Sequence, residues 1–175
     1  MKTIQIKLYS FNELSKDAQE TAIENVRENI TDYYHDRDAL NSLKEFAKHF
    51  NSELKGWEID FFNTSFSSVK FAEVEEMEES ELKELIMQMG EFNPETLKGL
   101  GDCKFTGVCF DEDAADGARK AFFAGERDVN EILQAGFNTW LKSVHADTDF
   151  LTSDEGIKEE IEANEYDFTE DGEQY

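Results

Sequence analysis

Two kinds of apolar spacing run along the chain, and together they predict a mixture of strands and helices. Apolar residues that alternate with polar ones predict an opening strand over Ile4–Leu8 and a hairpin with arms at Trp57–Phe61 and Val69–Phe71. Apolar residues three and four positions apart predict helices instead. These helices are expected to begin near Ser15, Asp38, Glu78, Ala114, Asp128 and Ser153.

The helix that begins near Asp128 has the strongest pattern in the chain. Its apolar residues form a broad stripe from Val129 to Val144, and Glu131 follows Asp128 at the spacing typical of a helix start. We therefore expect this helix to be central to the core. Ser15 is suited to cap the first helix, because a serine side chain accepts hydrogen bonds from the first turn.

Two shorter elements complete the prediction. Phe105–Phe110 is expected to be a strand, which would place Cys103 and Cys109 on one face as small core residues. The end of the chain, Tyr166–Tyr175, is expected to be a hairpin that turns at Asp171 and Gly172.

The irregular order of these elements favours an α+β fold over a parallel sheet, because no strand–helix rhythm and no internal repeat is present. We expect a single compact domain with a small, mostly antiparallel sheet. We expect residues 1–146 to form its α+β core and residues 147–175 to form an ordered acidic C-terminal helix-hairpin segment packed on the same domain.

The net charge of the chain restricts its possible partners more than its content of hydrophobic residues does. The 175 residues include 41 Asp and Glu against 17 Lys and Arg, a net charge of −24, which argues against nucleic acid or an anionic membrane as a direct partner. Hydrophobic residues make up 39% of the chain and aromatic residues 13%, which is enough for a folded core. Two cysteines, no leader pattern and no long apolar run predict a cytoplasmic protein without a membrane span.

Motifs that would indicate an enzyme are missing from the sequence. There is no glycine-rich phosphate loop, no His-Glu-x-x-His and no Gly-x-Ser-x-Gly. The acids between Asp111 and Gly117 do not follow the spacing of a calcium loop, whose last ligand position would be Phe122. We therefore expect no catalytic residue, no metal and no cofactor.

Most of the net negative charge comes from two short segments. Residues 73–84 hold seven acids and one base, and residues 147–175 hold twelve acids and one base. If residues 73–84 were helical throughout, repulsion between acids three or four apart would cost about 1–3 kcal/mol. A solvated face kept for solubility is one explanation of such acids.

Aromatic residues in the C-terminal segment favour a second explanation. Phe150, Tyr166 and Phe168 would be absent from a purely solvating tail, so we expect the segment to be ordered. Ordered carboxylates every few ångströms approximate the charge density of duplex DNA, which carries about one negative charge per 1.7 Å. The residues predicted to contact a partner in this way are Glu75, Glu76, Glu78, Glu79, Asp154, Glu155, Glu159, Glu160, Glu162, Glu165, Asp167, Glu170 and Asp171.

Three stretches also carry a resemblance: Leu8–Ala22, Ala163–Gly172 and the helical Asn138-Thr-Trp140-Leu-Lys. They resemble a family of small acidic proteins encoded by phages and mobile elements, some of them antitoxin-like. The resemblance brings no catalytic motif. It implies a phage setting, in which small acidic proteins often block host defence nucleases or other DNA-binding proteins.

Three functions follow as hypotheses. The first is a phage inhibitor, not an enzyme, that occupies the basic nucleic-acid-binding surface of a host protein in the cytoplasm, such as a CRISPR effector or restriction enzyme. The second is an antitoxin that covers a toxin's active site by apolar packing, and the third is an enzyme using scattered carboxylates. The target and the oligomeric state stay open.

Overall fold

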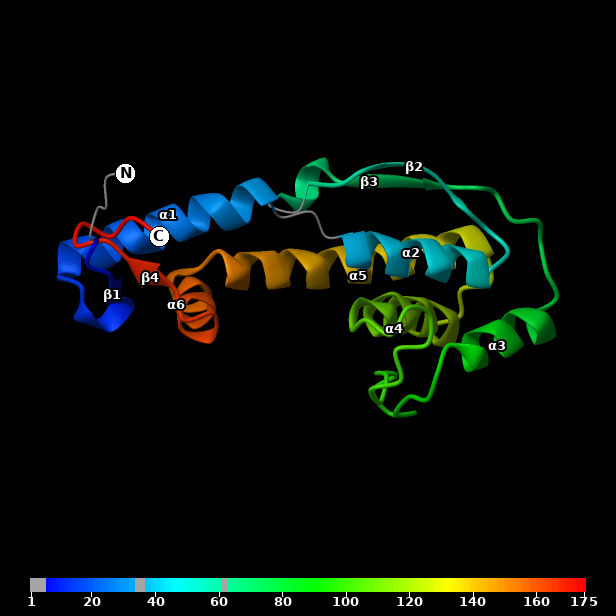
Figure 1. Cartoon of the computed structure of the whole chain (residues 1–175). Helices are drawn as coiled ribbons and strands as arrows, with labels where there is room; N and C mark the ends of the chain where they lie inside the picture. The colour runs from blue at the N-terminus through cyan, green and yellow to red at the C-terminus, as the bar shows by residue number, and fades with distance from the viewer. Residues whose placement is uncertain (1–5, 34–36, 61–62) are drawn as a thin grey trace, which may run out of the picture. The chain divides into compact units, whose positions relative to one another are not determined.

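The computed structural model of the chain describes residues 6–33, 37–60 and 63–175 (Figure 1). Its helices and two small antiparallel sheets make a mixed α+β fold, which confirms the predicted fold class. The chain divides into two compact units: unit 1 holds Met1–His35 and Thr148–Tyr175, and unit 2 holds Asp36–Asp147.

The unit boundary near residue 147 lies one residue from the division expected from charge. The N-terminal part differs, because the sequence pattern assigns it to the core whereas the structure groups it with the C-terminal segment. The reason is a long-range pairing: β1 (Tyr9–Ser10) is antiparallel to β4 (Asp167–Phe168), and α1 (Lys16–Tyr33) packs on α6 (Asp154–Ala163).

Unit 1 is built around the contact between α1 and α6, with a short 3-10 helix at Phe11–Glu13 before α1. The predicted cap at Ser15 forms, since its Oγ accepts from the Ala18 N–H at 3.2 Å. Ser153 caps α6 in the same way, and its Oγ accepts from the Gly156 N–H at 3.1 Å. The core side chains come from both helices and both strands, and they are Phe11, Leu14, Ala18, Ala22, Ile23, Val26, Ile157, Ile161 and Phe168.

The two ends of unit 1 differ in how well the pattern predicted them. Residues 4 and 5 of the expected opening strand lie outside the described residues, and positions 6–8 are not a strand; the ladder begins at Tyr9 instead. The terminal hairpin is confirmed, since Phe168 bridges Gln174 and the Gly172 N–H donates to the Thr169 carbonyl at 3.1 Å.

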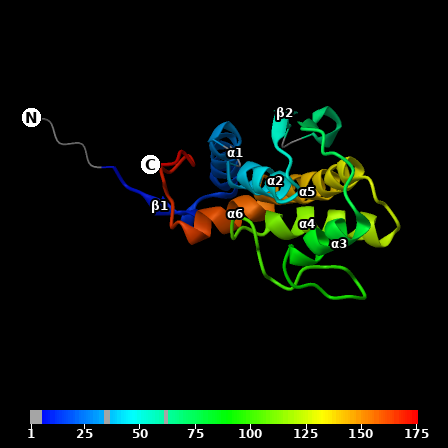
Figure 2. The ribbon, with the colours of Figure 1, turned by 90° about the vertical axis from the view of Figure 1, so that its right-hand side faces the viewer.

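Unit 2 packs its helices around a larger core. Its elements are α2 (Arg37–His49), β2 (Leu54–Glu58), the 3-10 turn Thr64–Phe66, β3 (Ser68–Phe71), α3 (Glu79–Gln88), α4 (Phe110–Phe123) and α5 (Val129–Leu151), whose last four residues belong to unit 1. Figures 1 and 2 both show α2, α4 and α5 side by side. Trp140 of α5 is fully buried and donates its Nε1–H to the Ala39 carbonyl of α2 at 3.1 Å.

The expected strand over Phe105–Phe110 is wrong, because this stretch is a turn that leads into α4. Its backbone donors bind a side chain: Asp111 Oδ2 accepts from the N–H groups of Phe105, Thr106 and Gly107 at 2.5–3.0 Å. Backbone groups bound this way cannot pair with a neighbouring strand.

The two cysteines are not core residues, contrary to the prediction. Cys103 is half-buried and Cys109 is exposed, because the turn that carries them is not a strand with one inward face. Burial raises the pKa of the Cys103 thiol, and nearby acidic charges add to the shift. Both thiols are free. Among the described residues, no helix is both long enough and apolar enough to cross a membrane.

Candidate protein-binding surface

Acidic side chains are unevenly distributed between the two units. Unit 1, the smaller unit, carries 17 acidic and five basic residues, and unit 2 carries 24 and 12. The two units therefore carry equal net negative charge, but unit 1 carries it on far fewer residues.

One stripe of carboxylates runs along α1. Asp17, Glu20, Glu24 and Glu28 are all exposed and recur at intervals of three and four residues, so they share one face of the helix. At about 1.5 Å of rise per residue, the four carboxylates extend over about 16 Å. The buried side chains of α1, such as Ala22 and Val26, lie on the opposite face and hold the stripe toward solvent.

Arg27 connects this stripe to the start of α6. Its guanidinium donates to Glu24 Oε1 at 2.6 Å, to the Asp154 carboxylate, and through Nε to the Thr152 carbonyl at 2.8 Å. The hydrogen bond that Arg27 donates to the Glu24 carboxylate is the main cause that raises the pKa of Arg27. Asp17, Glu20, Glu24 and Asp154 line one open hollow of about 540 Å³. Arg27 thus fixes Asp154 beside the α1 stripe while neutralising part of its charge.

Helix α6 adds a second group of carboxylates. Glu155, Glu159 and Glu162 are exposed and share one face of the helix, opposite the buried Ile157 and Ile161. The predicted contact residues of the C-terminal segment that are exposed are Asp154, Glu155, Glu159, Glu162, Glu165, Asp167, Glu170 and Asp171. All of them can accept hydrogen bonds from lysine or arginine side chains of a partner.

Glu160 is the exception in the C-terminal segment, because it is half-buried and accepts a hydrogen bond from the Tyr166 hydroxyl at 3.2 Å. Burial, with the charge of Glu160, raises the pKa of Tyr166 and keeps its hydroxyl protonated as a donor. Glu160 therefore has a role inside unit 1. At the hairpin, the hydroxyl of Thr169 binds Asp171 and lowers the pKa of that carboxyl.

The acidic segment of unit 2, residues 73–84, is helical only in its second half. Residues 73–78 are not helical, so helical repulsion within 73–84 is confined to α3 and its N-terminal end. Asn130 holds the Val74 backbone through its side-chain amide at 3.2 and 3.3 Å. Arg127 binds the Glu79 carboxylate at 2.7 Å.

The predicted contact residues of unit 2 are all exposed, namely Glu75, Glu76, Glu78 and Glu79. They lie in another unit from the residues of the C-terminal segment, so the structure divides the thirteen predicted residues into two separate groups. In the described part of the chain, no three of the His, Cys, Asp and Glu side chains are grouped so that they could hold a metal ion.

Comparison with protein-family models, with curated proteins and with solved structures gave no significant match.

Charge totals over long segments of the sequence do not reveal the α1 stripe. Residues 1–72 hold 12 acids and nine bases, which is close to balance. These totals do not show on which side of a helix the charges lie. The exposed side of α1 carries Asp17, Glu20, Glu24 and Glu28, whereas most of the nine bases lie elsewhere in the sequence. A projection of residues 16–33 around a helix axis would have found the stripe.

Proposed function

We propose that the protein is a non-enzymatic inhibitor from a phage or mobile element that occupies the basic nucleic-acid-binding surface of a host protein. The targets that fit are defence nucleases and CRISPR effectors. The observation that supports the proposal is the dense acidic surface of unit 1, formed by the α1 stripe, Asp154 and the outward face of α6.

The spacing of the acids suits a groove that normally holds phosphates. Helix α6 has four exposed acids in ten residues. At about 1.5 Å per residue this is about one carboxylate per 4 Å, close to the phosphate spacing of about 3.4 Å along one DNA strand. Because α1 and α6 pack on a common core, their carboxylates are held in place before the partner arrives.

Competition with DNA is the first test. A host protein captured by the full chain should be displaced by a duplex oligonucleotide, and its affinity for the chain should fall steeply as salt rises. A captured protein that binds the chain and the oligonucleotide at the same time would contradict the proposal, because the two ligands would then occupy different surfaces.

Charge reversal is the second test. We predict that the triple change Glu155→Lys, Glu159→Lys and Glu162→Lys weakens binding by about tenfold or more, since each lost or reversed exposed pair is worth about 0.2–1 kcal/mol. The matched control in unit 2 reverses Glu73, Glu75 and Glu76 and should weaken binding less. All six side chains are exposed, so both variants should fold. Equal binding by the parent and the α6 variant would contradict this assignment of the surface.

The antitoxin hypothesis is the alternative, and the exposed apolar side chains of unit 2 favour it. Phe66 is 67% exposed and Leu100 is 62% exposed, so each offers apolar surface to a partner. Apolar packing predicts an affinity that hardly changes between about 50 and 500 mM salt, whereas contacts between exposed charges are strongly screened over that range. The salt titration therefore separates the two hypotheses.

A further inference from the structure

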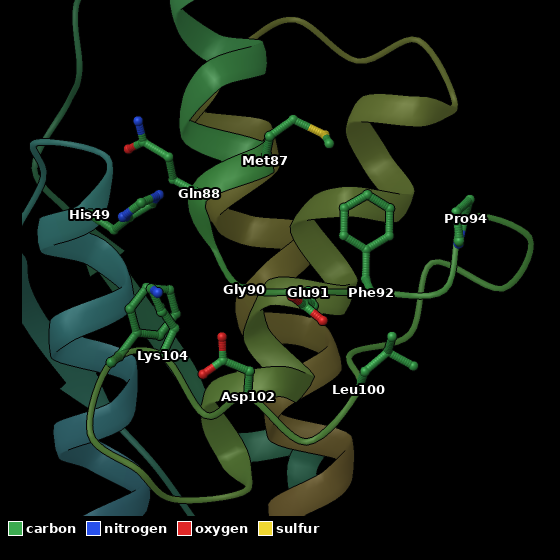
Figure 3. A pocket seen from close by; sticks show the side chains of 11 residues that line it. His49, Met87, Gln88, Gly90, Glu91, Phe92, Pro94, Leu100, Asp102 and Lys104 are labelled. Atoms are coloured by element: carbon green, nitrogen blue, oxygen red, sulfur yellow. The ribbon is translucent and has the colours of Figure 1, made fainter.

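Unit 2 contains an open cavity of about 890 Å³ beside the C-terminal end of α3 (Figure 3). Most of its wall is the long connection from Met89 to Cys109, which joins α3 to α4 (Figure 2). Connections of this length without a helix or strand are uncommon in compact units, and they often carry function. The cavity volume is within the range of ligand sites.

Helix α4 holds this connection in place through three buried charged side chains. Asp111 and Arg119 are 1% exposed and Asp116 is 9% exposed. Asp111 binds the backbone of Phe105–Gly107, and Asp116 accepts from the Gly99 N–H at 2.9 Å. Burying charged side chains is costly unless each is bound, so these contacts define one conformation of the wall.

Arg119 holds the other end of the connection. Its guanidinium donates to the Met89 carbonyl at 2.7 Å, binds Asp116 at 3.1 Å and stacks on the Phe92 ring at 4.8 Å. The wall is therefore attached to α4 at its start, its middle and its end. A cavity built in this way exists before a ligand binds, which lowers the entropic cost of binding.

The lining combines apolar surface with two carboxylates. Figure 3 shows Glu91 and Asp102 near its centre, with Phe92 and Leu100 on one side and Lys104 on the other. Met87 contributes further apolar surface and is 49% exposed. The two acids outnumber the one lysine of the lining, so the cavity is complementary to a cation with an apolar stem.

We propose that this cavity binds a segment of a partner protein by taking up an arginine side chain that has apolar neighbours. A guanidinium can bind carboxylates with two parallel hydrogen bonds and stack on an aromatic ring, whereas a lysine ammonium offers a point charge. Arg119 and Phe92 already make such a stack within the wall. The proposal does not depend on the acidic surface of unit 1.

The test uses the full chain with methyl-labelled methionine and three capped tripeptides, acetyl-Leu-Arg-Phe-amide and its Gln and Glu counterparts. The Met87 methyl resonance should shift in a saturable way with the Arg peptide, and Met77, which does not line the cavity, should report no binding. The Gln peptide should bind about fivefold more weakly. No saturable shift with the Arg peptide, or tighter binding of the Glu peptide, would overturn the proposal.

Three variants locate the binding site. Asp102→Asn should weaken binding of the Arg peptide about fivefold, and Lys104→Gln should strengthen it. Glu95→Gln is the matched control, because Glu95 is exposed on the same connection and does not line the cavity. The triple lysine variant of α6 should bind the peptide as the parent does, so this test and the test of the acidic surface can fail separately. Unchanged binding by Asp102→Asn would refute the assigned site.

Discussion

Asp111→Asn is the change that should reveal most directly how unit 2 keeps its long connection in place. Oδ2 of Asp111 accepts three backbone N–H bonds, and Oδ1 accepts from the hydroxyls of Thr106 and Ser42. An asparagine can keep its oxygen toward the three N–H groups, and its amide can donate to hydroxyls that rotate to accept. The substitution therefore removes the charge while it preserves the shape and most of the bonds.

The expected loss of stability follows from those three N–H bonds. A hydrogen bond to a charged group contributes about 1.5–3 kcal/mol and a neutral one about 0.5–1.5 kcal/mol, so each bond should weaken by about 1 kcal/mol. We predict that Asp111→Asn lowers the free energy of unfolding of unit 2 by about 3 kcal/mol. Asp102→Asn makes the same chemical change at an exposed side chain and should alter stability by less than about 0.5 kcal/mol.

The aromatic residues of the chain allow each unit to be followed separately. Both tryptophans, Trp57 and Trp140, belong to unit 2, and all five tyrosines belong to unit 1. Urea unfolding monitored by tryptophan fluorescence should show the full loss in Asp111→Asn, and the tyrosine signal should shift less. A loss below about 1 kcal/mol in the tryptophan transition would refute the argument, since it would mean that charge adds little to these bonds.

Two further predictions concern a glycine and a half-buried acid. Gly172 has φ +90°, and a Cβ there would lie 2.2 Å from the Ala18 carbonyl oxygen, so Gly172→Ala should destabilise unit 1 by about 2 kcal/mol or more in tyrosine-monitored unfolding. Gly101→Ala, at φ +88° without a close neighbour, should cost only about 1 kcal/mol; equal losses would contradict the role of the Ala18 contact. Burial, with the charges of Asp116 and Glu112, raises the pKa of Asp113, although a hydrogen bond from Ser143 opposes the shift. The folded state then holds this proton more tightly than the unfolded state, so the free energy of unfolding should fall as pH rises from the usual 3.8 through the raised pKa. Asp113→Asn should remove that decrease. A pKa of Asp113 at or below 3.8 in an NMR titration would contradict the prediction.

Helical periodicity predicted the helices well because each of them buries one face. The stripe over Val129–Val144 became the buried side of α5, and α6 begins at its serine cap. Start positions moved where the first turn is polar: α4 begins at Phe110 rather than near Ala114, because Asp111 and Glu112 belong to its first turn. Local propensity and burial along a single element are sufficient for this part of the fold.

The hydropathy pattern could not predict contacts that depend on one polar side chain or on residues far apart in the sequence. The turn at Phe105–Gly107 depends on the carboxylate of Asp111, which a hydropathy pattern treats as an ordinary polar position. The pairing of β1 with β4 joins the two ends of the chain through only two residues on each side. Neither local alternation nor turn residues contain that information. The same limit applies to the cavity of unit 2, because most of its lining comes from a connection that has no helix or strand.

Solubility alone does not account for the arrangement of acids on unit 1. The α1 stripe contains three like-charged pairs, Asp17 with Glu20, Glu20 with Glu24 and Glu24 with Glu28, and α6 adds Glu155 with Glu159 and Glu159 with Glu162. At about 0.2–0.5 kcal/mol for each pair, the repulsion totals about 1–2.5 kcal/mol before the attractive pairs made by Arg27 and Lys158 are subtracted. Interspersed bases would keep the surface equally soluble without this cost, as Arg27 does for Glu24. A partner that supplies positive charge would relieve the same repulsion on binding. The arrangement of acids therefore favours a protein that binds the basic surface of a partner.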